Sequence, residues 1–97
     1  MRASASRACM MLRVLANEDR LLLLCQLIQG ARNVGELEAL LDIRQPTLSQ
    51  QLTVLREEGC VTTERKGKFI IYSLANVEVV EIMRTLYSLY CDKNSNK

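Results

Sequence analysis

Histidine is absent from this 97-residue sequence, and its absence excludes several kinds of chemistry. Histidine is a frequent general base, titrates near neutral pH and is the most common metal ligand in proteins. A Ser-His-Asp or Cys-His enzyme is therefore excluded, as is any zinc site that requires an imidazole. No two of the four cysteines have C-x-x-C spacing, which argues against a zinc ribbon and against a thioredoxin-like oxidoreductase.

Long apolar runs are also missing, and glycine and proline are scarce. The longest apolar runs, such as residues 21–25, are far shorter than the roughly 20 residues of a membrane span. No sustained apolar stretch follows Arg2 and Arg7, so we expect no secretory signal, no membrane partner and a cytoplasmic location. With 48% hydrophobic residues, 25% charged residues, four glycines and one proline, residues 1–97 have the composition of one packed domain.

The apolar pattern predicts a mainly helical protein with one β-hairpin. Asn17 is a suitable cap for a helix that starts at Glu18 and stops before Gly30. The inward face of that helix is expected to carry Leu21, Leu24, Cys25 and Ile28, and the helix as a whole to be almost wholly buried. The predicted helices span residues 8–15, 18–29, 34–41, 45–58 and 76–90, the predicted strands span 60–64 and 69–74, and a polar tail covers 92–97.

Residues 34–58 have the features of a helix-turn-helix. Residues 30–33 form a turn before the first helix, and Pro46 suits the first turn of the second, where a missing N–H costs no hydrogen bond. Leu48, Leu52 and Leu55 fall on the inner side of this second helix, so its polar residues face outward. A helix of this kind fits the major groove of DNA and presents its first residues to the base edges.

The hairpin that follows, residues 60–74, resembles the wing of a winged helix. Its predicted turn, residues 65–68, carries three positive charges around one glycine. The net charge of +2 is too small to indicate DNA by itself, so the position of the cations matters more than their number. The sequence predicts base contacts from Gln45, Thr47, Ser49 and Gln50, and contacts to the DNA backbone from Arg44, Arg56, Arg65, Lys66 and Lys68.

The last predicted helix, within residues 76–91, has two apolar faces and is expected to serve in dimerisation and sensing. One face carries Val80, Met83, Tyr87 and Cys91, and the adjoining face carries Val79, Ile82 and Leu86. Together with Met10, Met11 and Val14 of the first helix, it offers a surface for a homodimer. Two copies would read two half-sites about one turn of DNA apart.

Several motifs, in order, resemble the ArsR/SmtB-type bacterial repressors over residues 12–91. They are Ala16-Asn17-Glu18-Asp19-Arg20-Leu21, Val34-Gly35-Glu36-Leu37, Gln45-Pro46-Thr47-Leu48-Ser49-Gln50-Gln51-Leu52, Leu55-Arg56-Glu57-Glu58-Gly59 and Tyr72-Ser73-Leu74. The resemblance implies an α+β winged helix-turn-helix homodimer that represses transcription at double-stranded operator DNA and is released by an inducer. It implies no enzymatic activity, and we expect no cofactor.

The positions of two cysteines resemble one branch of that family, the BigR-, SqrR- and HlyU-like repressors. Cys25 ends the run Leu21-Leu22-Leu23-Leu24-Cys25, and Cys91 ends Leu86-Tyr87-Ser88-Leu89-Tyr90-Cys91. In that branch, the resemblance implies, these two thiols lie close together and are bridged by persulfides, polysulfides or other oxidants, and DNA affinity falls. Cys60 and Cys9 are interpreted as ordinary thiols without a sensing role.

Three other functions stay open at this point. A thiolate metal sensor would bind Cu(I), Zn(II), Cd(II) or As(III), although residues 34–41 hold no cysteine and the chain has no histidine; we expect no metal site. A small thiol redox enzyme would turn over with a dithiol reductant. A winged helix used only for protein contacts would have no salt-sensitive affinity for DNA.

Overall fold

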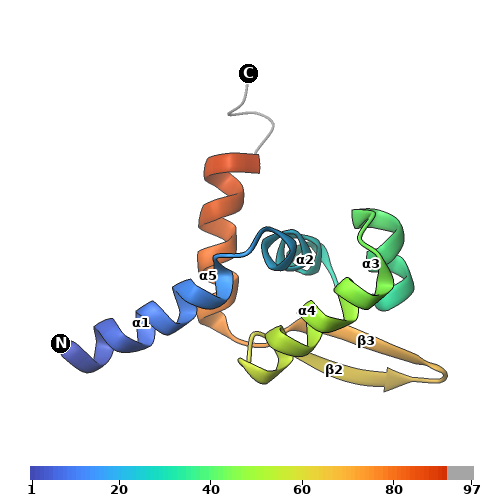
Figure 1. Cartoon of the computed structure of the whole chain (residues 1–97), viewed down its shortest axis with the longest axis horizontal. Helices are drawn as coiled ribbons and strands as arrows, with labels where there is room; N and C mark the ends of the chain where they lie inside the picture. Colours follow the sequence, from blue (N-terminus) through green and yellow to red (C-terminus); the bar gives the residue numbers. More distant parts are fainter. Residues whose placement is uncertain (92–97) are drawn as a thin grey trace.

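Five α-helices and a three-stranded antiparallel sheet form the part of the chain that the computed structural model describes, residues 1–91 (Figure 1). The elements are α1 Arg2–Leu15, α2 Glu18–Gln29, β1 Arg32–Asn33, α3 Val34–Leu41, α4 Gln45–Glu57, β2 Val61–Lys66, β3 Phe69–Leu74, α5 Val77–Leu86 and a π-helical turn, η1, Tyr87–Cys91. The predicted α+β winged helix-turn-helix is confirmed. The predicted polar tail, 92–97, lies outside the described residues.

Helix α2 is the centre of the fold and contacts α1, α3, α4, α5 and β3. Its start is as predicted, because the Asn17 side chain accepts a hydrogen bond of 3.0 Å from the backbone N–H of Arg20. Its buried side chains are Leu23, Leu24 and Leu27. The expected inward face was therefore only partly right: Leu21, Cys25 and Ile28 are half-buried, and Leu22 is 40% exposed. One side of α2 is thus not covered by the core and remains partly exposed.

Helices α3 and α4 form the helix-turn-helix. Asn33 and Glu36 make a reciprocal capping box at the start of α3, and Asp42 ends it in the left-handed conformation, with φ of 56°. Pro46 lies in the first turn of α4. Leu48, Leu52 and Leu55 are buried as predicted, so the opposite face of α4 points away from the core.

The sheet differs from the prediction at two places. Strand β2 continues to Lys66, which pairs with Phe69, so the turn is confined to Gly67, with φ of 61°, and Lys68. The predicted turn before α3 contains a two-residue strand instead, because Arg32 pairs with Tyr72 on β3 and gives the order β1-β3-β2. The hairpin of β2 and β3, called the wing below, projects from the body beside α4 (Figure 1).

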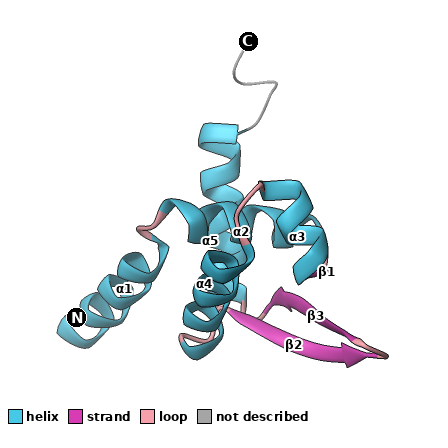
Figure 2. Cartoon of the chain, turned by 45° about the vertical axis from the view of Figure 1, so that its right-hand side comes forward, coloured by secondary structure: helices cyan, strands magenta, loops and turns pink. Residues whose placement is uncertain are grey.

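Helix α1 begins at Arg2 and not near Ala8, so it has 14 residues and is longer than the predicted helix 8–15. It extends away from the body on the side opposite the wing (Figure 2). Met11 and Val14 pack on the core, whereas Met10 is 53% exposed. None of the helices in residues 1–91 has the length and apolar character needed to cross a membrane.

Candidate nucleic-acid interface and thiol pair

The outer face of α4 carries most of the residues predicted to contact bases. Gln45, Ser49 and Gln50 are exposed, whereas Thr47 is half-buried. Thr53, which the sequence analysis missed, lies one turn beyond Ser49 on the same face, and its Oγ1 donates a hydrogen bond of 2.9 Å to the Ser49 carbonyl oxygen. The spacing of four residues from Ser49 was the signal that would have found it.

All five cations predicted to contact the DNA backbone are exposed. Arg44 precedes α4 and Arg56 lies in its last turn, so the helix has a positive charge at both ends. On the wing, Lys68 lies with its Nζ 5.6 Å from the centre of the Phe69 ring. Arg65 and Lys66 extend the charge along the end of β2. Helix α4 contacts β2, so the helix lies next to the strand that carries Arg65 and Lys66.

The side chain of Arg20 on α2 makes hydrogen bonds to both α1 and α4. Its Nε donates to the carbonyl oxygen of Val14 at 2.5 Å, and its Nη1 donates to Oε1 of Gln51 at 2.9 Å. A longer contact of 3.4 Å joins Nη2 to the carbonyl oxygen of Arg13. Gln51 is consequently turned inward, unlike its neighbour Gln50. Sequence reasoning missed this connection, because Arg20 and Gln51 lie 31 residues apart.

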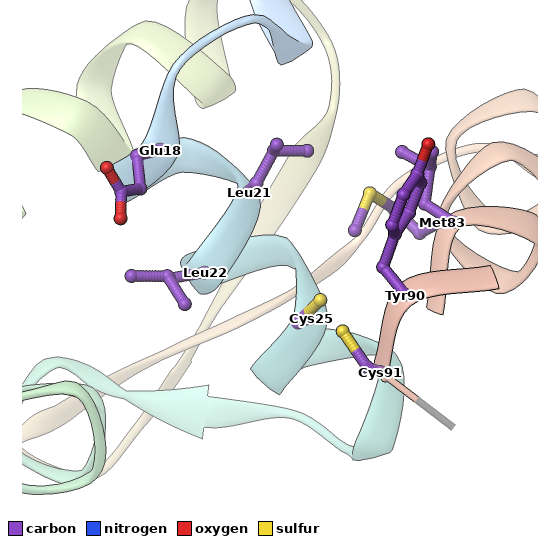
Figure 3. Close-up of a pocket in the computed structure, with 8 residues that line it drawn as sticks. Glu18, Leu21, Leu22, Cys25, Met83, Tyr90 and Cys91 are labelled. Carbon is purple, nitrogen blue, oxygen red and sulfur yellow. The ribbon is translucent and has the colours of Figure 1, made fainter. Parts of the chain in front are cut away.

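Cys25 on α2 and Cys91 on η1 face each other (Figure 3). Cys25 is half-buried, whereas Cys91 is exposed. Burial raises the pKa of the Cys25 thiol above its ordinary value, and the charge of Cys91 and a hydrogen bond with its side chain raise it further. The two cysteines that the sequence singled out are therefore brought together. The more accessible of the two is Cys91.

The other two cysteines lie apart from this pair. Cys60 is fully buried in the core, which agrees with its interpretation as a small apolar residue. Burial raises the pKa of its thiol, the nearby Glu58 raises it further, and Arg20 opposes this in part. Cys9 is exposed on α1. Neither has the neighbouring thiol that Cys25 has in Cys91.

An open cavity of about 460 Å³ adjoins the thiol pair. Residues of α2 spaced three and four apart form one wall, and residues of α5 and η1 form the other. The described residues that line it are Glu18, Leu21, Leu22, Cys25, Met83, Leu86, Tyr90 and Cys91. The walls are almost entirely apolar, and Glu18 is the single charged side chain among these lining residues.

The thiol pair does not match an ordinary protein site for a metal ion. Among residues 1–91, no three His, Cys, Asp or Glu side chains are grouped closely enough to hold one. Two thiolates supply half of the four ligands of a structural zinc site.

Apolar side chains remain exposed on both terminal helices. Leu12 is 59% exposed on α1, Val77 is 72% exposed at the start of α5, and Leu89 and Tyr90 are 64% and 73% exposed on η1. Large exposed apolar side chains on neighbouring elements are typical of an interaction surface. These side chains are not the ones that the sequence predicted for dimerisation. Of that predicted set, Met10, Tyr87 and Cys91 are exposed, whereas Val79 and Met83 are buried in the core.

The sequence is similar to those of known bacterial regulatory proteins. A family model described as "Bacterial regulatory protein, arsR family" matches residues 17–63. The chain is 49% identical to the biofilm growth-associated repressor of Agrobacterium fabrum over 96 residues, covering 99% of this chain and 82% of that protein. It is 37% identical to the transcriptional activator HlyU of Vibrio cholerae over 94 residues, covering 97% and 87% of the two chains.

Solved structures of such proteins superpose closely on the chain. The structure of reduced HlyU from Vibrio cholerae gives a TM-score of 0.91 at 37% identity, with 95% of this chain and 97% of that chain covered. The crystal structure of the transcriptional repressor BigR from Xylella fastidiosa gives 0.87 at 43% identity, with 94% and 90% covered.

Proposed function

The chain belongs to the ArsR family of bacterial regulatory proteins, and we propose that the Cys25–Cys91 thiol pair switches its binding to operator DNA. Members of this family are DNA-binding transcriptional regulators and not enzymes, and dimers are typical of them. The interpretation as a small redox enzyme is thereby excluded. The proposal concerns the signal that this regulator senses, and it depends on one observation: the two thiols face each other between α2 and η1.

The DNA-binding surface combines α4 with the wing. Gln45, Ser49 and Gln50 are exposed and available to base edges, and the half-buried Thr47 supports the same face. Arg44, Arg56, Arg65, Lys66 and Lys68 are free to meet phosphates on either side of the groove. In the homodimer, two such surfaces contact the two halves of one operator.

Cys91 reacts first in this scheme, because it is exposed and Cys25 is half-buried with a raised pKa. The Cys91 thiolate attacks the outer sulfur of a persulfide R–S–SH, the S–S bond of the donor breaks, and RS⁻ leaves. Cys25 then loses its proton and attacks Sγ of the Cys91 persulfide. A Cys25–Cys91 disulfide forms and HS⁻ leaves, so the two protein thiols are oxidised by two electrons and the donor is reduced to RS⁻ and HS⁻.

A bridge with an additional sulfur atom forms if a second donor molecule reacts before Cys25. The Cys91 persulfide attacks the sulfur that carries R, displaces HS⁻ and gives Cys91–S–S–S–R. Cys25 then attacks the middle one of the three linked sulfur atoms and displaces RS⁻, which leaves a trisulfide between the two cysteines. The accessible thiol thus starts both routes, and the protected thiol completes them.

The bridge changes DNA binding through helix α2. It fixes α2 to η1 at Cys25, while Arg20, in the first turn of α2, holds Gln51 of α4. A new constraint on α2 therefore biases the position of α4 relative to the rest of the dimer. Two recognition helices that no longer match the spacing of their half-sites bind the operator more weakly.

The test is a DNA titration of four proteins before and after treatment with an organic persulfide. Wild type is expected to lose at least about tenfold in affinity, which corresponds to a coupling of about 1.4 kcal/mol. Cys25→Ser and Cys91→Ser are expected to bind DNA normally and to lose no affinity on treatment. Cys9→Ser, which removes an exposed thiol outside the pair, is the matched control and should respond like wild type.

Two results would overturn the proposal. A full response in Cys25→Ser would mean that no bridge is needed. Release of wild-type protein from DNA by Cu(I), Zn(II), Cd(II) or As(III), without any response to persulfide, would favour the thiolate metal sensor.

A further inference from the structure

The cavity beside the two thiols has the size and lining to hold the organic part of a sulfur donor. It holds about 460 Å³ between α2 and the α5–η1 segment, within the range of small-molecule sites. An enclosed apolar cavity of about 150 Å³ is enough to bind benzene, so an aryl or alkyl group has ample room here. Cys25 and Cys91 are part of its lining, so a group held in it lies next to both reacting sulfur atoms.

The side chains of the cavity favour an apolar group. Leu21 and Leu22 come from α2, and Met83 and the ring of Tyr90 come from the opposite wall (Figure 3). Leu86 of α5 also lines the cavity. Transfer of each CH₂ group from water to such a surface is favourable, and the gains add up over a group of six or seven carbons. A donor with a bulky apolar R group is therefore concentrated at the thiols, whereas a donor without one is not.

The charge of the cavity disfavours an anion. Glu18 lies in the first turn of α2, and among the described residues that line the cavity it is the one with a charge. Its carboxylate repels a donor that carries carboxylates of its own, such as glutathione persulfide. Burial, the charge of Cys91 and a hydrogen bond with its side chain raise the pKa of the Cys25 thiol, so these surroundings also disfavour a negative charge.

We propose that this cavity selects organic persulfides with an apolar, uncharged R group, and that it discriminates against donors with a small or an anionic R group. This inference rests on the proposed switch, since it names the class of inducer for the same thiol pair. The cavity contributes binding and orientation of the R group. The covalent steps remain those of Cys91 and then Cys25.

The experiment measures the rate at which full-length protein forms the Cys25–Cys91 bridge with benzyl, methyl and glutathione persulfide. Each rate is divided by that of the same donor with free cysteine, which removes the intrinsic reactivity of the donor. The expected corrected rate is about tenfold higher for benzyl than for methyl persulfide, because the benzyl group buries apolar area in the cavity. Glutathione persulfide is expected to be the slowest.

Two variants test the two properties of the cavity separately. Glu18→Gln is expected to raise the corrected rate with glutathione persulfide by about threefold, less at high salt, and to leave benzyl persulfide unchanged. Glu38→Gln, on the exposed side of α3, removes the same charge outside the cavity and should change neither rate. Leu22→Asn has nearly the same shape and is 40% exposed in wild type, so it is expected to fold and to lose much of the preference for benzyl over methyl.

The outcomes separate this inference from the switch itself. Equal corrected rates for all three donors, or a fastest reaction with glutathione persulfide, would overturn the selection by the cavity while leaving the switch intact. No effect of Glu18→Gln and Leu22→Asn would overturn it as well. Failure of every donor to form the bridge would instead contradict the proposed function.

Discussion

Arg20 ties the helix that carries Cys25 to the helix that carries the predicted DNA-reading residues: its Nη1 donates a hydrogen bond of 2.9 Å to Oε1 of Gln51. Its Nε donates at the same time to the carbonyl oxygen of Val14 at the end of α1. One side chain therefore joins α1, α2 and α4. In the proposed switch, a change in the position of α2 passes to α4 through this contact.

Replacing Arg20 with Met is expected to lower the free energy of unfolding by about 1–3 kcal/mol, because Gln51 and the carbonyl oxygen of Val14 lose their donor in a partly buried place. Combined with Gln51→Ala, the two changes should be less than additive by about 1 kcal/mol. Urea unfolding measures both values. Arg13→Met, an exposed arginine on α1, is the control, and additive effects of Arg20 and Gln51 would mean that the two side chains are not coupled.

Gln50→Ala tests the outer face of α4. An exposed glutamine that bonds a base edge contributes to the operator complex and not to non-specific binding, so we expect a loss of about 1–3 kcal/mol on the operator alone. Competition titrations with operator and scrambled DNA measure the ratio. Gln29→Ala, which removes an exposed glutamine from α2, should leave the ratio unchanged. Equal weakening on both DNAs would assign Gln50 to the backbone.

Removing two cations from the wing is expected to change the salt dependence of DNA binding. Each lost phosphate contact lowers the slope of log affinity against log salt by about 1, so Lys66→Ala with Lys68→Ala should flatten it by about 2. Arg2→Ala with Arg84→Ala removes the same charge from α1 and α5 and serves as the control. A slope that falls equally in both double variants would reflect net charge and not contacts of the wing.

The pKa of the Cys25 thiol is raised, so the rate of bridging should still increase with pH above about 8.5, where an ordinary thiol is already half ionised. Alkylation of Cys25 by iodoacetamide, followed by peptide mass spectrometry, gives its titration curve directly. In Cys91→Ser the midpoint should move down but stay above the ordinary value, because burial is the largest cause and remains. A midpoint below the ordinary range would mean that a cation near Cys25 outweighs burial.

The same shift predicts how stability depends on pH. The fold favours the protonated thiol of Cys25, so its contribution to stability is fully present below the pKa of the unfolded chain. That contribution is lost as pH rises through the higher pKa of the folded state.

Much of the fold could be predicted because its signals are local. Asn17 caps α2 where the sequence placed it, and the leucines of α4 are buried at the predicted spacing. What was missed depends on partners that are distant in the sequence. Arg32 is in a strand because Tyr72 pairs with it, and β2 continues to Lys66 because Phe69 lies opposite.

The candidate site also has features that the sequence indicated and features that it did not. The exposed face of α4 follows from helical periodicity, and the pairing of Cys25 with Cys91 came from a family resemblance. Neither signal revealed the cavity beside the thiols, because its two walls come from separate helices whose packing decides the space between them. The contact of Arg20 with Gln51 could not be predicted either, because it depends on how α2 packs against α4.

The most direct test of the switch combines mass spectrometry and DNA titration on one sample of reduced protein treated with an organic persulfide. The account predicts a Cys25–Cys91 crosslink in digested peptides, as a disulfide or heavier by whole sulfur atoms, together with loss of operator affinity in proportion to the bridged fraction. A protein that is fully bridged and still binds its operator with unchanged affinity would contradict it, as would loss of affinity with both thiols unmodified.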